Sequence, residues 1–366
     1  MSYRCSIYNL GIAANRPIPG VPSSSIDSID VRICFGPLPA WTYEVDPRET
    51  EVSHTSEYTD NSGQALLRVS RLFGGTHHHF RYADGTEFLV DKAGSEIQCC
   101  WRDPLTIEDA ATYLLGPVFG FVLLLRGMVC LHASAVVVDS EAVALVGPAG
   151  SGKSTTAAAF SSRGISIAAE DVVTLDDRND HFLVRPSYPC IRLWPASVKA
   201  LYGDESHLPL LTPNWDKRYL ELTPEKFERE PLPLSAIYVL GERVDDAAAP
   251  FVQPLDRTDA LLSLIANTYT NYLMDRQMQA RQFDLLTRVL ANIPVRKVTP
   301  HTDARRLPEL CDCILDDFAS RNGDCHSHSS SISAPRSQRI SVSSALTLPR
   351  TDHLTQRTQR TAEIAE

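Results

Sequence analysis

The feature that most constrains this chain is a glycine-rich segment between a strand-like stretch and a helix-like one. Residues 147–154 read GPAGSGKS, which fits the pattern G-x-x-x-x-G-K-[ST] without a mismatch. The apolar stretch Ala142 to Val146 precedes it, and the Ala-rich stretch Lys153 to Arg163 that follows stops at Gly164. A strand, a loop and a helix in this order let backbone N–H groups surround a phosphate at a helix N-terminus. The sequence therefore predicts a phosphate-binding loop in an α/β domain.

The residue types in this loop indicate a nucleotide with a metal ion. Glycines permit a left-handed backbone and leave room for the phosphate. Lys153 would place a positive charge on the β- and γ-phosphates, and the hydroxyl of Ser154 would coordinate Mg²⁺. We expect ATP and Mg²⁺ as cofactors, with the nucleotide held by Gly147, Pro148, Ala149, Gly150, Ser151, Gly152, Lys153, Ser154 and Thr155. The loop alone does not choose between an ATPase, a GTPase and a kinase, because all bind the nucleotide in the same way.

Two adjacent carboxylates and a histidine are the candidates for chemistry beside the loop. Glu170 and Asp171 follow the predicted strand Ile165 to Ala169. At the carboxyl end of such a strand, one carboxylate can hold Mg²⁺ while the other accepts a proton from an attacking hydroxyl. His132 stands at the start of the strand that we expect to pair with Ala142 to Val146. A polar strand end and a structural histidine are the alternative interpretations of these residues.

Composition excludes several classes of protein. The net charge of −10 provides no cationic field for nucleic acid or for an anionic membrane. The nine cysteines form no Cys-x-x-Cys pair, and with no export signal at the N-terminus this favours the cytoplasm. The long apolar run from Tyr113 to Leu131 is interrupted by Pro117, Gly120 and Arg126, so we interpret it as a buried helix rather than a membrane span.

The chain divides into three regions by pattern. Early turn residues and a hairpin signal at Asp84-Gly85 indicate a β-rich N-terminal domain. From Pro104 the apolar spacing becomes helical, and strands then alternate with helices. The last part is poor in large apolar residues and is predicted to be disordered. The expected boundaries are 1–103, 104–320 and 321–366.

Further elements are expected within the second region. A tight turn at Asp139-Ser140 would join a strand from Ala133 to Val138 to the strand before the loop. Pro195 opens a short helix that ends at Gly203. Two amphipathic helices are predicted over Asp259 to Leu273 and Arg276 to Ala291.

These motifs resemble the HPr kinase/phosphorylase superfamily, whose catalytic domain shares its fold with phosphoenolpyruvate carboxykinase. That family has a histidine, a hairpin, a phosphate loop, a helix ending in Arg-Gly, a short strand and an acid pair. The corresponding residues here are His132, Gly147 to Ser154, Arg163-Gly164 and Glu170-Asp171. The closer resemblance is to HPr-kinase-related proteins of peptide-modification clusters, and it extends to Ile191-Arg192-Leu193-Trp194-Pro195 and Pro233 to Tyr238.

The resemblance implies a fold and a set of roles. The fold class is α/β, a P-loop kinase domain of the HPr kinase/phosphoenolpyruvate carboxykinase type preceded by a β-rich N-terminal domain. Glu170 looks like the proton acceptor, with His132 tuning it, and Asp171 and Ser154 look like Mg²⁺ ligands. The family has Asp where this chain has Glu170, and the segment used near the phosphorylase site is absent, so kinase activity is implied more strongly than phosphorolysis. Lys217 and Arg218 could neutralise the transferred group or simply be solvated bases.

The function expected from these residues is an ATP- and Mg²⁺-dependent kinase for a serine or other hydroxyl of a peptide or small protein. A kinase for a small-molecule hydroxyl and a non-catalytic ATP-binding regulator are the alternatives. A pure regulator needs a metal ligand but has no need of a proton acceptor beside it, so the acid pair separates the two. Self-association stays an open alternative, and neither nucleic acid nor membrane is an expected partner.

Overall fold

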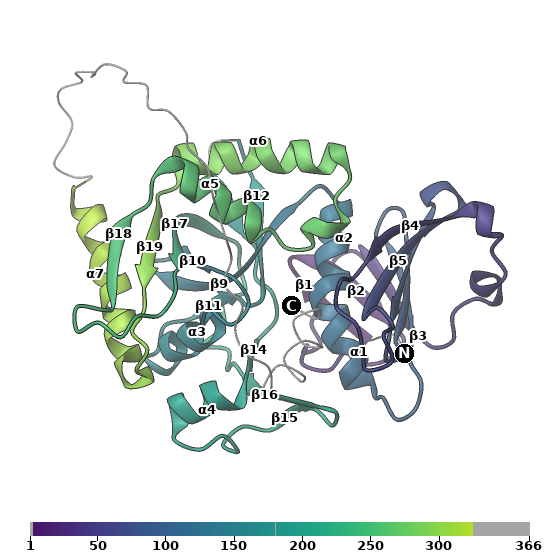
Figure 1. Cartoon of the computed structure of the whole chain (residues 1–366), viewed down its shortest axis with the longest axis horizontal. Helices are drawn as coiled ribbons and strands as arrows, with labels where there is room; N and C mark the ends of the chain where they lie inside the picture. Colours follow the sequence, from purple (N-terminus) through teal and green to yellow (C-terminus); the bar gives the residue numbers. More distant parts are fainter. Residues whose placement is uncertain (1–2, 180, 325–366) are drawn as a thin grey trace.

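The computed structural model describes residues 3–179 and 181–324 as a mixed α/β protein with two eight-stranded sheets (Figure 1). The expected disordered tail, 321–366, lies outside the described residues from position 325 onward. Its first four residues belong to the helix α7 (Leu307–Asp324).

The first sheet contains every strand up to residue 100. Its spatial order is β1 (Tyr3–Ile7), β2 (Leu10–Ala14), β3 (Val31–Phe35), β8 (Glu96–Cys100), β7 (Glu87–Asp91), β6 (His77–Tyr82), β5 (Leu67–Leu72) and β4 (Thr50–Thr55). The predicted hairpin is confirmed, because β6 and β7 pair antiparallel around Gly85, whose φ is +94°. Short 3₁₀ turns lie at η1 (Ala40–Tyr43), η2 (Pro47–Glu49) and η3 (Phe73–Gly75).

A buried helical run follows this sheet. It consists of α1 (Ile107–Tyr113), the π-helical turn η4 (Leu114–Val118) and α2 (Phe119–Leu125). By length and composition this run could cross a membrane, but 89% of its most apolar window is buried inside the structure. The expected buried helix is therefore present but shorter than predicted, since Gly127 turns the chain at a φ of +80° and Leu131 already lies in a strand.

The helical run completes the core of the first sheet. Phe80 of β6 and Phe121 of α2 meet edge to face at 5.4 Å, and both belong to one buried cluster. Figure 1 shows α1 and α2 between the two sheets. The helix that the sequence pattern assigned to the second domain thus covers an apolar face of the first, which a lone sheet would expose.

The second sheet holds the glycine-rich loop. Its strands are β10 (Glu141–Val146), β9 (Val129–Val138), β12 (Val172–Asp177), β13 (Phe182–Val184), β17 (Leu232–Leu240), β19 (Val295–Thr299), β18 (Phe251–Pro254) and β11 (Ile167–Ala169). The predicted tight turn is confirmed: β9 and β10 pair antiparallel, and Asp139 and Ser140 both have positive φ. β10 pairs with both β9 and β17. The strands β10, β9, β12, β13 and β17 therefore form a closed ring of pairings.

Strand direction gathers the chain's candidate residues at one edge. β17 runs parallel to β10, and β19 runs parallel to β17. β11 is antiparallel to β9, as β10 is, so it also runs with β10. The carboxyl ends of β10, β11, β17 and β19 therefore lie at the same edge of the sheet, where open α/β sheets bind ligands.

Helices cover both faces of this sheet, as alternating strand residues require. Ala144 packs with α5 (Arg257–Ala266) and α6 (Arg276–Asn292), while Val143 packs with α3 (Lys153–Ser162) and α7. The predicted helix at Pro195 is confirmed as α4 (Pro195–Tyr202). It lies beside a three-stranded sheet of β14 (Cys190–Leu193), β16 (Trp215–Glu221) and β15 (Leu210–Thr212).

The predicted helix from Asp259 to Leu273 is wrong in its second half. α5 ends at Ala266, and only the 3₁₀ turn η5 (Asn271–Leu273) follows before α6. Between them the backbone pairs with β9 instead: His132 N donates to Asn267 O at 2.8 Å, and Tyr269 N donates to Cys130 O at 2.8 Å. Hydrogen bonding to a strand edge has overridden the helical pattern.

Candidate functional site

The loop between β10 and α3 adopts the backbone that a phosphate cradle needs. Gly150 and Gly152 have φ values of +78° and +107°, in the region that favours glycine. Lys153, 5% exposed, folds back over the loop, and its Nζ donates to Gly147 O at 2.8 Å and to Pro148 O at 3.1 Å. The lysine charge therefore lies inside the curve of the loop.

Two of the loop glycines lie close to other protein atoms. A Cβ on Gly147 would lie 2.7 Å from Ser151 Oγ and 3.2 Å from the backbone oxygen of Leu240. A Cβ on Gly152 would lie 2.8 Å from Nη2 of Arg243. The backbone of β17 therefore restricts position 147, whereas at position 152 a side chain would displace the guanidinium of Arg243.

The first acid of the pair contacts the loop. Ser154 Oγ donates to Glu170 Oε1 at 2.5 Å, and the side chain of Glu170 is 3% exposed. The backbone N–H of Glu170 donates to Ser187 Oγ at 3.2 Å, which anchors the end of β11. A hydroxyl oxygen and a carboxylate oxygen thus lie together beside Lys153, as the parallel directions of β10 and β11 dictate.

The second acid faces a different set of partners. Asp171 Oδ2 accepts from Arg192 Nη2 and from the hydroxyl of Tyr269, the latter at 3.0 Å. Its other oxygen, Oδ1, lies 3.7 Å from Nε2 of His132. The backbone of Asp171 has a φ of +68°, which aspartate tolerates better than most residues and which turns its side chain away from the direction that Glu170 takes. The acid that contacts Ser154 is therefore Glu170, whereas the resemblance had implied that Asp171 binds Mg²⁺ together with Ser154.

Arg192 balances the buried negative charge of the acid pair. Its side chain is 5% exposed, and its Nε lies 4.0 Å from Glu170 Oε2. Burial alone lowers the pKa of Arg192, but the nearby Tyr188, Asp171 and Glu170 outweigh it and hold that pKa well above the usual value. Burial, reinforced by Asp171, raises the pKa of Tyr269, so its hydroxyl is neutral and can donate. One guanidinium thus serves two carboxylates that would otherwise repel each other.

His132 is positioned by backbone pairing on both sides. It lies opposite Val172 in the β9–β12 register, and on its other side its N–H binds the Asn267 carbonyl. Its ring meets the ring of Tyr269 edge on, with centroids 5.8 Å apart. β9 therefore places His132 beside the acid pair. His132 is two positions from Cys130, whose carbonyl accepts the hydrogen bond from the backbone N–H of Tyr269.

A cavity of about 430 Å³ is lined by the loop, His132 and Arg192, whereas the buried side chains of Glu170, Asp171 and Tyr269 are not part of its lining. Its lining includes His132, Gly150, Gly152, Lys153, Ser154, Thr155, Arg192, Trp194, Ser197 and Arg243. The structure therefore brings the expected histidine, lysine and loop serine to one space. Thr155 Oγ1 and Ser197 Oγ are 2.7 Å apart and join α3 to α4 at its rim.

The two basic residues expected nearby do not line this cavity. Lys217, 1% exposed, lies with its Nζ 4.9 Å from the ring centre of Trp194, a cation–π contact. Arg218 pairs with Leu193 across the small sheet. Lys217 therefore contacts Trp194, which does line the cavity.

Three contributors escaped the sequence analysis. Arg192 belongs to a motif of the resemblance that carries no predicted role, yet its guanidinium pairs with both acids. Arg243, in the segment after β17, donates a hydrogen bond to the backbone of the loop. Tyr269 lies in a stretch predicted as helix. Arg192 lies within β14 and Arg243 follows β17, and an arginine in or after an apolar strand does not distinguish a site residue from a surface one.

Comparisons with known proteins add a distant structural similarity. Neither a protein-family model nor a curated protein sequence matches this chain. Among solved structures, the HPr(Ser) kinase/phosphatase from Coxiella burnetii is similar, with a TM-score of 0.32 and 17% identity over 54% of this chain and 96% of that chain. Similarity of this degree does not indicate an activity, so the function is inferred from the site residues.

Proposed function

We propose that this chain is an ATP- and Mg²⁺-dependent kinase with a P-loop domain of the HPr kinase type, which phosphorylates a hydroxyl of a peptide or small protein. The observation that carries the proposal is the acid pair: Glu170 contacts Ser154 of the loop, and Asp171 lies next to it with His132 beside it. A protein that only binds a nucleotide needs the first of these contacts and has no use for the second.

The donor groups fit a magnesium ion and a phosphate chain. Mg²⁺ prefers oxygen ligands, and Ser154 Oγ and Glu170 Oε1 are already neighbours, which favours them as its protein ligands. Asp171 is a poorer candidate because Arg192 already supplies its positive partner. When bound there, Mg²⁺ would neutralise charge on the β- and γ-phosphates. The positive φ of Gly150 and Gly152 suits a loop whose backbone N–H groups surround a phosphate.

The remaining groups are arranged for transfer to a hydroxyl. Lys153 would stabilise the negative charge of the transferred phosphoryl group, since charge stabilisation dominates this chemistry. The oxygen of the acceptor hydroxyl forms a bond to the γ-phosphorus while the bond from that phosphorus to the bridging oxygen breaks, and ADP leaves. The hydroxyl proton passes to Asp171 Oδ1, the oxygen that faces His132, and the imidazole can then take it toward solvent.

Arg192 and Tyr269 position this proton acceptor. Both bind Asp171 Oδ2 and so leave Oδ1 directed at His132. The peptide class of acceptor rests on the resemblance to HPr-kinase-related proteins, whose motifs run through His132, the loop and the acid pair.

Phosphoryl transfer tests the proposal directly. The purified full chain is incubated with Mg²⁺ and ATP labelled at its γ-phosphate, together with a library of short peptides that carry one serine or threonine. The same library with alanine at that position controls for transfer elsewhere, and Lys153→Ala is the enzyme control. We expect label only with the hydroxyl-bearing peptides and the wild-type chain.

Other outcomes decide between the alternatives. Label found only in small hydroxyl compounds of a cell extract would replace the peptide acceptor by a metabolite. Tight, Mg²⁺-dependent ATP binding with no label in any acceptor would overturn the kinase and favour the regulatory interpretation.

A further inference from the structure

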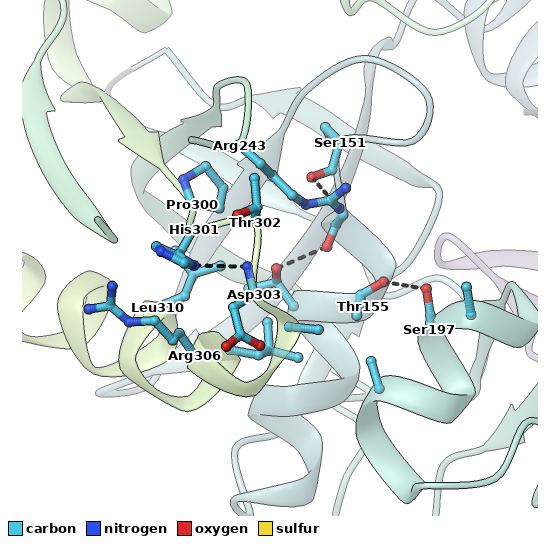
Figure 2. Close-up of a pocket in the computed structure, with 16 residues that line it drawn as sticks. Ser151, Thr155, Ser197, Arg243, Pro300, His301, Thr302, Asp303, Arg306 and Leu310 are labelled. Atoms are coloured by element: carbon cyan, nitrogen blue, oxygen red, sulfur yellow. Dashed lines mark hydrogen bonds between the residues drawn. The ribbon is translucent and has the colours of Figure 1, made fainter. Parts of the chain in front are cut away.

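A second cavity, of about 230 Å³, adjoins the one lined by the glycine-rich loop and His132. The two share Gly152, Thr155, Ala196, Ser197 and Arg243 in their linings. Figure 2 shows the second cavity with Thr155 and Ser197 on one side and His301, Thr302 and Asp303 on the other. None of the roles assigned above uses the groups on that far side.

The sheet topology explains why this space lies beside the loop. Arg243 follows β17, and residues 300–304 follow β19. Both strands run parallel to β10, so the segments after them lie at the same sheet edge as the phosphate loop. The acid pair lies on the opposite side of β10, beyond β9. A nucleotide with its terminal phosphate beside Ser154 can therefore extend along this edge toward Arg243 and residues 300–304.

The walls of the cavity combine apolar faces with a polar rim. Ala196 and Ala200 of α4 and Leu307 and Leu310 of α7 contribute apolar lining, which suits a flat ring. His301, Thr302 and Asp303 supply the polar rim. Ligand sites for small molecules have this combination of apolar lining and a few placed polar groups.

The rim is fixed by its own hydrogen bonds. Nδ1 of His301 accepts from the backbone N–H of Asp303 at 2.8 Å, so its proton lies on Nε2 when the ring is neutral (Figure 2). Hydrogen bonds from Arg305 lower the pKa of Asp303 to about 2, so its carboxylate offers acceptors only. A preformed rim of this kind lowers the ordering cost of binding.

Arg243 and Ser151 lie at the junction of the two cavities. Nη2 of Arg243 donates to Ser151 O at 3.2 Å, and the hydroxyl of Ser151 is buried without a hydrogen-bond partner among the described residues. Figure 2 shows the Arg243 side chain extending toward Ser151. A guanidinium and an unused hydroxyl are suited to the point where a phosphate chain joins a sugar.

We propose that this second cavity binds the nucleoside of the nucleoside triphosphate, with the base between α4 and α7 and Arg243 at its junction with the phosphates. The inference rests on the proposed function, because it requires the phosphates in the loop. It adds the nucleoside subsite and the residues that make this protein bind a nucleotide rather than any polyphosphate.

The test compares ATP with inorganic tripolyphosphate, which carries the phosphates without the nucleoside. Ala200→Trp and Thr302→Trp fill the cavity from opposite walls, and Lys199→Trp places the same side chain on α4 at an exposed position outside it. Mg²⁺-dependent binding of both ligands is measured by calorimetry on the full chain, after thermal unfolding has verified that each variant is folded.

We expect Ala200→Trp and Thr302→Trp to weaken ATP binding by about tenfold or more, which is about 1.4 kcal/mol, with tripolyphosphate changed less than about twofold. Lys199→Trp should leave both affinities unchanged. Equal losses for ATP and tripolyphosphate, or wild-type ATP affinity in both filled variants, would overturn the nucleoside subsite alone. If the wild-type chain binds neither ligand, or if Lys153→Ala binds both normally, the proposed function fails and the subsite with it.

Discussion

The hydroxyl of Ser154 and the carboxylate of Glu170 are joined by a hydrogen bond of 2.5 Å between the first turn of α3 and the end of β11. The adjacent Asp171 has no such contact and is held by Arg192 and Tyr269 instead. Two neighbouring acids of the same charge therefore have different environments, which is how sites assign different tasks to similar groups. This favours Glu170 as the metal ligand and Asp171 as the proton acceptor, the reverse of the roles expected from the sequence.

Paired substitutions separate these roles. Asp171→Asn removes the basicity of the proton acceptor, so Mg²⁺-ATP should still bind while phosphoryl transfer falls by about 10² to 10⁴. Glu170→Gln weakens a metal ligand, so Mg²⁺-dependent ATP affinity and transfer should decline together. Calorimetric binding and label transfer are measured for each variant, at a temperature where both are folded.

The opposite pattern would restore the assignment expected from the sequence. If Glu170→Gln binds Mg²⁺-ATP normally but transfers nothing, Glu170 is the proton acceptor. His132→Ala gives an independent check, since it should resemble Asp171→Asn in milder form.

Removal of Arg192 should destabilise the fold because it leaves two buried carboxylates without their shared partner. We expect Arg192→Met to lower the free energy of unfolding by about 3–5 kcal/mol, measured by urea denaturation. Combined with Asp171→Asn, which removes one of the charges, the loss should be smaller than the sum of the single effects. Arg163→Met, which breaks the more exposed pair with Asp312, should cost less than about 1 kcal/mol. Additive losses at Arg192 and Asp171 would show that the two side chains are not coupled.

Two glycines with positive φ separate backbone strain from site geometry. Gly152→Ala and Gly164→Ala both put a Cβ on left-handed backbone, and each should lower the free energy of unfolding by about 1–2 kcal/mol. Only the Cβ at position 152 meets Arg243, at 2.8 Å, whereas position 164 has no atom within 4 Å. ATP affinity should therefore fall in Gly152→Ala and remain at the wild-type level in Gly164→Ala, as measured by calorimetric titration. Equal affinities in the two variants would place the nucleotide away from this loop.

The parts of the site that the sequence predicts are those encoded locally. The loop, its flanking strand and helix and the tight turn at Asp139-Ser140 depend on residues within a few positions of one another, and all are present. The partners of Asp171 are not local. Arg192 is 21 residues away and Tyr269 is 98, and their approach depends on pairing between distant strands.

Tertiary context also decided where the sequence pattern was misleading. Residues 267–269 fit an amphipathic helix, yet their backbone groups bind β9 next to His132. The helical run after residue 104 has the spacing of a new domain, but Phe121 and its neighbours complete the core of the first sheet. Neither outcome can be derived from periodicity, because both depend on which apolar face or strand edge the rest of the chain leaves uncovered.

Burial of a histidine in β6 should make the stability of the fold depend on pH. His78 packs against Phe121, with ring centres 4.8 Å apart, and its burial is the main cause that lowers its pKa to about 4. Below the ordinary histidine pKa of about 6.5 the unfolded chain takes up a proton that the folded chain refuses, so stability falls as pH decreases from about 6.5 to about 4 and is fully present above that window. The loss should amount to about 1–3 kcal/mol and should be absent in His78→Phe, which keeps an aromatic ring against Phe121. His77→Phe, on the opposite face of the same strand, should retain the loss. Urea unfolding at pH 7, 6, 5 and about 4.5 measures the difference, and parallel pH profiles for wild type and His78→Phe would contradict a neutral, buried His78.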